Sequence, residues 1–183
     1  REGLETDIAR WTPEWATRWA PAPVPDAVRR DPIFLVGFPR SGTTLLDTML
    51  MGLPELCVLE ERPMIAEVSR MLGTADLAAL TTQQCAQLRE AYFASALRHG
   101  WDGERWLVDK HPLNMARTAL IHRMFPDARF ILAERHPADV VLSCFMANFT
   151  LNFAMRSFTD LHEAAHTYDA VFRAWHRAGA VSY

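Results

Sequence analysis

An apolar strand, a glycine-bounded turn and a helix follow one another in residues 33–46, IFLVGFPRSGTTLL. Gly37 and Gly42 allow the backbone of the turn to curl without a Cβ clash, so that successive N–H groups can point at an anion. The start of the helix adds its positive end. Hydroxyl donors and a planar cation also lie in the turn, at Arg40, Ser41, Thr43 and Thr44. The segment therefore predicts a phosphate-binding loop.

The glycine spacing of residues 37–44 matches the nucleotide-binding pattern G-x-x-x-x-G-K-[ST]. Thr43, however, stands where that pattern requires a lysine. We therefore expect phosphate-like groups to bind this loop and do not expect an ordinary NTPase.

Residues 39–44, PRSGTT, resemble the 5′-phosphosulfate loop of the sulfotransferases that use 3′-phosphoadenosine 5′-phosphosulfate. Residues 130–143, FILAERHPADVVLS, resemble the 3′-phosphate motif of that family, with Arg135 at the end of a strand and Ser143 on the following helix. The resemblance covers roughly residue 31 to the C-terminus. Glu60, Glu61 and Arg62 make the chain more similar to the tyrosylprotein-type and bacterial, often repeat-fused, enzymes than to the small-phenol type.

Apolar runs alternate with helical patterns after residue 32. We expect strands at 33–37, 56–60, 105–109 and 128–134, and helices at about 42–52, 63–72, 81–99, 112–124, 136–147 and 157–178. This alternation is typical of an α/β fold, and we predict a P-loop-type three-layer domain with a central parallel sheet and helices on both faces. Both phosphate motifs lie at strand ends, where such folds bind ligands.

Two segments are expected along the chain. Residues 1–25 form an N-terminal helix and a proline-rich linker, and 26–183 form the sulfotransferase domain, expected to be incomplete at its C-terminus because similar proteins continue. Trp11, Trp15 and Trp19 recur at a spacing of four. They pack either on the domain itself, or on an upstream repeat domain or a second copy of the chain.

Composition limits which partners the protein is expected to bind and which cellular compartment it is expected to occupy. A net charge of −3 without a basic run disfavours nucleic acid, and no stretch reaches the roughly 20 apolar residues of a membrane span. Cys57, Cys85 and Cys144 have no CxxC spacing and predict free thiols in a reducing cytoplasm. Residues 162–166, HEAAH, match the short zinc-protease pattern, but no third ligand is evident, so we expect no metal.

Sulfuryl transfer to a hydroxyl needs an anchored donor, a cation at the leaving oxygen and a base. Lys110 is the single lysine among nineteen basic residues, which favours a functional role, and it or Arg40 can neutralise the leaving oxygen. The resemblance implies that Arg40, Ser41, Gly42, Thr43 and Thr44 bind the 5′ end of the donor and that Arg135 and Ser143 bind its 3′-phosphate. The alternative for Arg135 is a surface ion pair with Asp139.

Glu61 matches the general base of the tyrosylprotein-type enzymes. The rival base is His111, although alternation along an extended strand points it away from the side that Lys110 faces. The alternative is that Glu60 and Glu61 have no catalytic role and only interact favourably with the positive N-terminal end of the next helix.

We expect a sulfotransferase whose acceptor is a hydroxyl of a peptide, for example protein tyrosine, or of a glycan, lipid or small molecule. A P-loop kinase or NTPase, and a non-catalytic nucleotide-binding scaffold, remain the alternatives.

Overall fold

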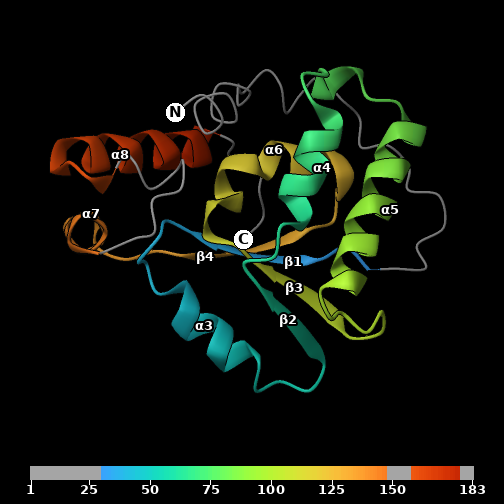
Figure 1. Ribbon diagram of the computed structural model, residues 1–183, viewed down its shortest axis with the longest axis horizontal. Coiled ribbons are helices and arrows are strands. Elements are labelled where there is room, and N and C mark those ends of the chain that lie inside the picture. Colours follow the sequence, from blue (N-terminus) through green and yellow to red (C-terminus); the bar gives the residue numbers. More distant parts are fainter. Residues whose placement is uncertain (1–29, 148–157, 178–183) are drawn as a thin grey trace.

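A computed structural model of the protein describes residues 30–147 and 158–177 (Figure 1). Its elements, with η for 3-10 helices, are β1 (Ile33–Gly37), α3 (Thr43–Leu50), β2 (Leu56–Glu60), α4 (Met64–Leu72), η1 (Leu77–Ala79), α5 (Thr82–Arg98), β3 (Trp106–Lys110), η2 (Pro112–Arg117), α6 (Thr118–Met124), β4 (Arg129–Ala133), α7 (Pro137–Met146) and α8 (Leu161–Arg177). All four predicted strands are present, with ends that differ from the prediction by at most one residue.

The four strands form one parallel sheet in the order β2-β3-β1-β4. In the register of this sheet Leu35 lies opposite Lys110, and Gly37 lies opposite Ala133. Because parallel strands end at the same edge, the turn after β1, the turn after β2 and the end of β3 come together. The predicted α/β fold with a central parallel sheet is confirmed.

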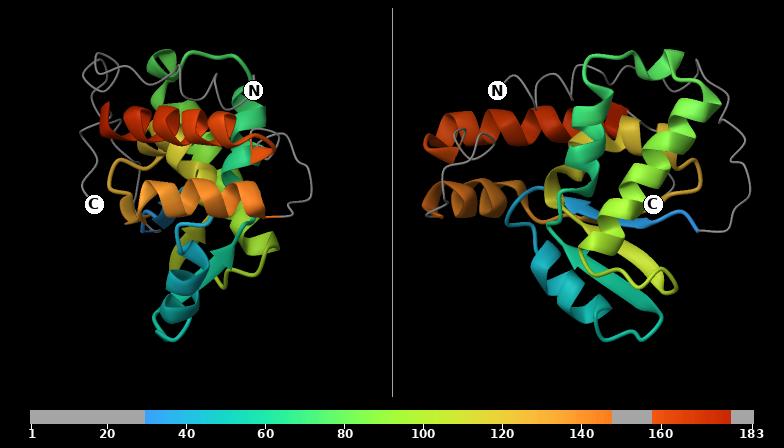
Figure 2. Two further views of the ribbon diagram at one scale, coloured as in Figure 1. Left: turned by 90° about the vertical axis from the view of Figure 1, so that its left-hand side faces the viewer. Right: turned by 45° about the vertical axis from the view of Figure 1, so that its right-hand side comes forward.

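Helices lie on both sides of this sheet. Figure 1 shows α3 on one side and α4, α5 and α6 on the other, and Figure 2 shows α7 and α8 running side by side. The larger core lies between the sheet and the second group of helices. There Phe34 of β1 stacks on Phe130 of β4, with ring centroids 5.5 Å apart, and contacts Tyr92 and Phe125 at 6.1 Å. Residues alternate along a strand, so Leu35 faces the opposite side, toward α3.

One predicted helix is divided. The segment 112–124 begins as the 3-10 helix η2 and becomes α-helical only at Thr118. The Thr118 hydroxyl donates a hydrogen bond of 2.9 Å to the carbonyl of Met115, and Asn114 turns its amide toward Asp109. The Thr118 side chain, which bonds to the backbone three residues earlier, competes with the α-helical ladder and favours the tighter turns before it.

Several sequence-based expectations fall outside the described residues. The tryptophans at 11, 15 and 19 and the whole segment 1–25 lie there, so their packing and the domain boundary stay predictions. Within residues 30–147 and 158–177, no helix combines the length and the apolar character that crossing a bilayer requires.

Candidate active site

The phosphate loop between β1 and α3 has a constrained backbone. A Cβ added at Gly37 would lie 2.6 Å from the carbonyl oxygen of Ala133 on β4, so only glycine fits this close approach. Gly42 has a φ of 100°, in the left-handed region, and no side chain caps the start of α3. In the first turn of α3 the N–H of Leu45 donates to the Gly42 carbonyl at 3.0 Å, and no side chain caps the N–H groups before it. This arrangement suits an anion at the start of the helix.

Aromatic packing anchors the loop to α8. The Phe38 ring lies 5.1 Å from that of Tyr168 and 5.6 Å from that of Phe158, measured between centroids. The Ser41 hydroxyl donates a 2.6 Å hydrogen bond to the Phe38 carbonyl, and Ser41 and Thr43 are both buried. The Ser41 side chain thus shapes the loop, whereas Thr44 is exposed.

Two predicted site residues have unusual backbone conformations. Among the described residues, Arg40 and Glu61 are the non-glycine residues with positive φ, at 72° and 47°. Such conformations cost free energy, and the surrounding structure must hold them. At Glu61 the backbone N–H donates a 2.7 Å hydrogen bond to the carbonyl of Lys110, which fixes the turn after β2 against the end of β3.

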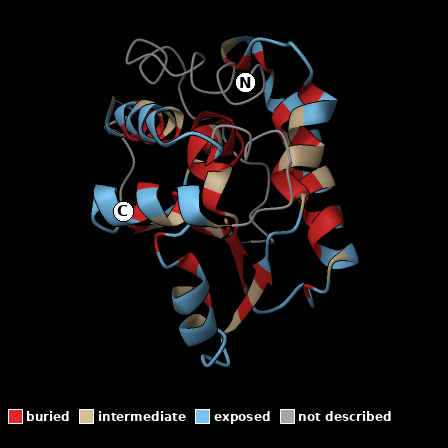
Figure 3. Ribbon diagram, turned by 60° about the vertical axis from the view of Figure 1, so that its left-hand side comes forward, coloured by how far each residue is buried: buried red, intermediate tan, exposed pale blue. Residues whose placement is uncertain are grey.

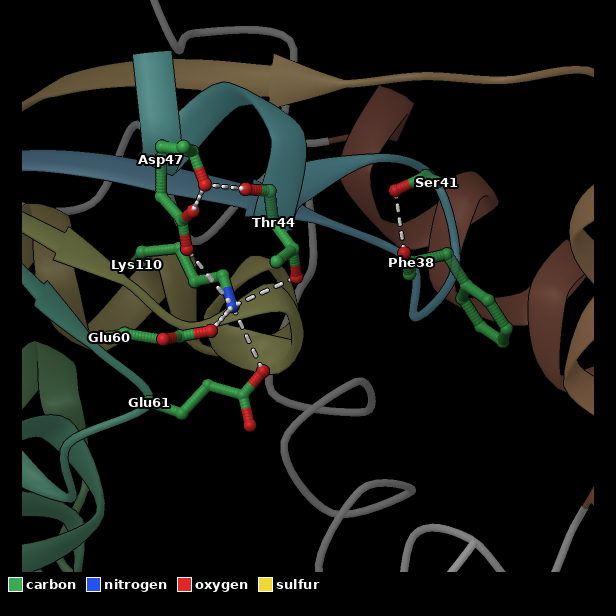
Figure 4. Close-up of polar contacts among 8 residues, drawn as sticks. Phe38, Ser41, Thr44, Asp47, Glu60, Glu61 and Lys110 are labelled. Atoms are coloured by element: carbon green, nitrogen blue, oxygen red, sulfur yellow. Dashed lines mark hydrogen bonds and ion pairs between the residues drawn. The ribbon is translucent and has the colours of Figure 1, made fainter. Parts of the chain in front are cut away.

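Lys110 lies at the centre of a cluster of oxygen atoms (Figure 4). Its Nζ donates to Glu60 Oε1 at 2.9 Å and to Glu61 Oε1 at 3.1 Å, and Thr44 Oγ1 lies 3.5 Å away. Asp47 Oδ2 of α3 is 3.3 Å away, an ion pair without hydrogen-bond geometry. Burial lowers the pKa of Lys110, but the hydrogen bonds to the two glutamates outweigh burial, so its pKa lies above the ordinary value. The amine is therefore an ammonium at neutral pH.

The two phosphate motifs also meet. Arg40 Nε donates a 3.0 Å hydrogen bond to Ser143 Oγ on α7, across 103 positions of the sequence. Arg135 does not share this contact. It forms the exposed pair with Asp139, at 3.6 Å, that the sequence suggested as its alternative role. Beside Ser143, burial raises the pKa of the Cys144 thiol to about 11, so this cysteine is a poor nucleophile. Cys57, Cys85 and Cys144 are free, as predicted, and all three are buried.

His111 is half-buried, and its Nδ1 has no hydrogen-bond partner. Burial, together with the charge of Arg117, lowers its pKa, so the imidazole is neutral at neutral pH. Its backbone N–H donates to the Leu35 carbonyl at 3.2 Å. Glu60 and Glu61 both contact Lys110 Nζ directly. Glu61 therefore stays the candidate base, and His111 stays its rival.

A buried polar group lies behind Lys110, on the other face of β3. Tyr92 donates a 3.0 Å hydrogen bond to Asp109 Oδ2, and Asn114 Nδ2 lies 3.5 Å from Asp109 Oδ1. Asn114 is thus turned into the protein, and its oxygen Oδ1 is buried without a partner. Burial raises the pKa of Asp109 to about 7, although the bond from Tyr92 opposes this rise.

We expect Asp109 to make stability depend on pH. Its pKa is about 7 in the folded protein and about 3.9 when unfolded, so between these values the folded state binds more protons. The contribution to the free energy of unfolding is therefore full below about pH 4 and falls, by about 2 kcal/mol, as pH rises from about 5 to 7. The free energy of unfolding, measured by urea titration at several pH values, should fall over that pH range in the wild type and fall less in Asp109→Asn. Identical pH dependence in both would show that Asp109 is ionised throughout.

In the described part of the chain, no group of three or more histidine, cysteine, aspartate or glutamate side chains is arranged to hold a metal ion. His162 and His166, from the short zinc-protease pattern, are exposed on α8 with ring centroids 6.5 Å apart.

Sequence reasoning missed Asp47. It is the one charged residue of α3, TTLLDTML, and it is buried although the helix exposes leucine and methionine. A lone acid in an otherwise uncharged helix beside a phosphate loop was the available signal.

Comparison with known proteins agrees with this geometry. A family model described as the sulfotransferase family matches residues 32–182. The chain belongs to the sulfotransferase family. The match includes the phosphate loop, the Lys110 cluster and Ser143, so the sulfotransferase resemblance predicted from two short motifs is confirmed over most of the chain.

Relatives within this sulfotransferase family include two proteins whose names specify tyrosine. The chain is 29% identical to protein-tyrosine sulfotransferase 2 of Gallus gallus over 129 residues, which are 65% of this chain and 35% of the relative. It is 29% identical to protein-tyrosine sulfotransferase 1 of Homo sapiens over 140 residues, 70% of this chain and 38% of the relative. An uncharacterized protein of Aquifex aeolicus is 27% identical over 190 residues, 95% of this chain and 25% of the relative. The chain thus spans only part of the length of each of these relatives.

Proposed function

We propose that the protein transfers a sulfuryl group from 3′-phosphoadenosine 5′-phosphosulfate to an acceptor hydroxyl by in-line displacement. The observation that carries the proposal is the position of Lys110 Nζ, 3.5 Å from Thr44 Oγ1 in the phosphate loop and 3.1 Å from Glu61 Oε1. A cation for the leaving group and a carboxylate for the acceptor proton are therefore neighbours. Membership of the sulfotransferase family supports the choice of donor.

In this reaction the acceptor oxygen attacks the sulfur, the bond from sulfur to the 5′-phosphate oxygen breaks, and adenosine 3′,5′-bisphosphate leaves. Glu61 accepts the proton of the acceptor hydroxyl, a contribution of roughly 10²- to 10⁴-fold for a positioned base. Lys110 and Arg40 stabilise the negative charge that grows on the bridging oxygen. No step in this scheme requires a metal ion.

The donor is held at its two phosphate ends. The loop 40–44 binds the 5′ end through Arg40, Thr44 and the first N–H groups of α3, with Ser41, Gly42 and Thr43 shaping the loop. Ser143 and Arg135 bind the 3′-phosphate, for which Arg135 has to leave Asp139. That exposed pair contributes at most about 1 kcal/mol, so a phosphate can replace the carboxylate at little cost.

Protein tyrosine is the acceptor that the names of the relatives favour, and a glycan, lipid or small-molecule hydroxyl is the alternative. The exposed Glu61 carboxylate is open to any of these acceptors, since its side chain is 58% exposed. A panel of a tyrosine-containing peptide, a glycan and a small phenol, each incubated with radiolabelled donor, distinguishes these classes. The free, buried cysteines favour a reducing compartment, and we propose the cytoplasm.

The rival functions make different predictions about ligands. A P-loop kinase or NTPase requires magnesium-dependent binding of ATP, and a non-catalytic scaffold binds the donor without turnover. Thr43 occupies the position of the lysine in the loop of such NTPases, and the ammonium near the loop comes instead from β3. This difference favours the sulfotransferase.

Adenosine 3′,5′-bisphosphate is expected to stabilise the protein without magnesium, by about 2.7 kcal/mol at one hundred times its dissociation constant. ATP should stabilise it much less, because ATP has no 3′-phosphate for Arg135 and Ser143. Thermal-shift titrations with both nucleotides measure this difference. Arg135→Ala should reduce the preference for the bisphosphate, whereas equal stabilisation by magnesium-ATP would overturn the proposed donor.

A further inference from the structure

Helix α3 buries its one charged residue and exposes part of its apolar surface. Leu45 and Met49 are 69% and 65% exposed, whereas Asp47, the only charge in the helix, is 1% exposed. Figure 3 shows pale-blue, exposed stretches along α3, below the sheet. A surface helix normally turns its apolar stripe toward the protein. Burying a carboxylate is costly unless the charge is paired. The orientation of α3 therefore indicates a specific partner for Asp47.

That partner is Lys110. Asp47 Oδ2 lies 3.3 Å from Nζ. Thr48 Oγ1 lies 3.3 Å from Asp47 Oδ1, although its hydroxyl donates to the Thr44 carbonyl at 2.8 Å. In Figure 4 Asp47 and Thr44 approach the ammonium from α3, while Glu60 and Glu61 approach it from the end of β2. Both members of the Asp47–Lys110 pair are almost fully buried, with side chains 2% and 0% exposed.

The carboxylates around Lys110 differ in what they can do when the donor binds. An ammonium has three protons, but four oxygen atoms lie within 3.5 Å of Nζ. To contact the bridging oxygen, Nζ has to give up existing partners. Glu60 and Glu61, 48% and 58% exposed, can be solvated by water, whereas the buried Asp47 has no such replacement.

We propose that Asp47 is a positioning residue, the fixed counter-charge that holds the Lys110 ammonium beside the phosphate loop while Glu60 and Glu61 release it. Its catalytic consequence rests on the proposed sulfotransferase function. The pairing itself does not, and the two can be tested separately.

The single lysine of the chain makes the pairing directly observable. In protein labelled with ¹⁵N-lysine at neutral pH, a buried and paired ammonium should give one slowly exchanging NH₃⁺ signal. Asp47→Asn should broaden or abolish this signal more than Glu60→Gln does. Asp169→Asn removes an equivalent carboxylate from the exposed pair with Arg173 on α8, and it should leave the signal unchanged. A wild-type signal preserved in Asp47→Asn would overturn the proposal.

The kinetic test separates positioning from donor binding. Asp47→Asn should lower kcat on the order of a hundredfold, because small misplacements of a reacting group have effects of this size. The dissociation constant of adenosine 3′,5′-bisphosphate should change little. Equal losses of kcat and of bisphosphate affinity would instead show that Asp47 supports the loop.

Asp47→Glu keeps the charge and remains informative if the asparagine variant does not fold. We expect it to retain the NH₃⁺ signal and more of the activity than Asp47→Asn. A folded glutamate variant that loses both would show that shape, rather than charge, matters at this position. A wild-type protein with the lysine signal but without sulfuryl transfer would contradict the proposed function and leave the Asp47–Lys110 pairing intact.

Discussion

Replacing Lys110 with alanine is expected to lower kcat for sulfuryl transfer by a hundredfold or more, while affinity for adenosine 3′,5′-bisphosphate changes little. The ammonium meets a charge that grows on the bridging oxygen only as the sulfuryl group departs, so its main effect is on the transition state. Single-turnover assays with radiolabelled donor, together with bisphosphate titrations, measure the two quantities. Loss of bisphosphate binding in the alanine variant would make Lys110 an anchor of the donor.

Folding has to be controlled in this experiment. Without Lys110 the buried carboxylate of Asp47 loses its partner, and breaking a buried ion pair typically costs about 3 to 5 kcal/mol. The double variant Lys110→Met with Asp47→Asn removes both buried charges and is expected to be more stable than Lys110→Ala, yet equally inactive. Recovery of turnover in this double variant would show that the alanine variant is inactive only because it is unfolded.

Lys110→Arg tests whether the single lysine is a consequence of an arginine-rich composition. The planar guanidinium is bulkier than an ammonium and has no room in a fully buried site that four oxygen atoms already surround. We expect this variant to retain little activity. Full activity would make Lys110 interchangeable with the eighteen arginines of the chain.

The strands and the phosphate loop are the features that the sequence predicts best. Each strand is a short apolar run, and Gly37 and Gly42 mark the turn, so the determinants lie within a few residues of one another. The parallel-sheet rule also predicts that the motifs at strand ends share one edge, and the contact between Arg40 and Ser143 agrees with it. That contact joins two residues that the motifs assign to opposite ends of the donor.

The Lys110 cluster was only partly predictable. Glu61 and Lys110 follow from family motifs and from composition, but their contact depends on β2 pairing with β3, which places Glu60 opposite Lys110. Asp47 depends in addition on how α3 is rotated about its axis. Apolar periodicity predicts a rotation that buries Leu45 and Met49. The observed rotation instead buries Asp47, which pairs with Lys110, and leaves Leu46 and Leu50 half-buried. An ion pair between two residues far apart in the sequence leaves no periodic pattern near either of them, so it could not be predicted from the sequence.

The proton-accepting role of Glu61 predicts the second large effect. Glu61→Gln keeps the size of the side chain but removes its basicity, so we expect kcat to fall by roughly a hundredfold or more with donor affinity near normal. Because Glu61 N–H binds the Lys110 carbonyl through the backbone, the substitution should leave the positive φ and the turn intact. The measurement is single-turnover transfer to the acceptor that the panel identifies.

The neighbouring groups supply the controls for Glu61. Glu60→Gln removes a carboxylate that contacts the same ammonium at 2.9 Å, so it reports the loss of charge at Lys110 without loss of the base. His111→Ala removes the rival base, a neutral imidazole that contributes no charge to the cluster. If Glu61 is the base, its variant is the slowest of the three, and supplying a small carboxylate such as formate to Glu61→Ala should restore part of the rate. If instead His111→Ala abolishes turnover while Glu61→Gln remains active, the histidine is the base. In that case the three carboxylates around Lys110 serve only to hold the ammonium.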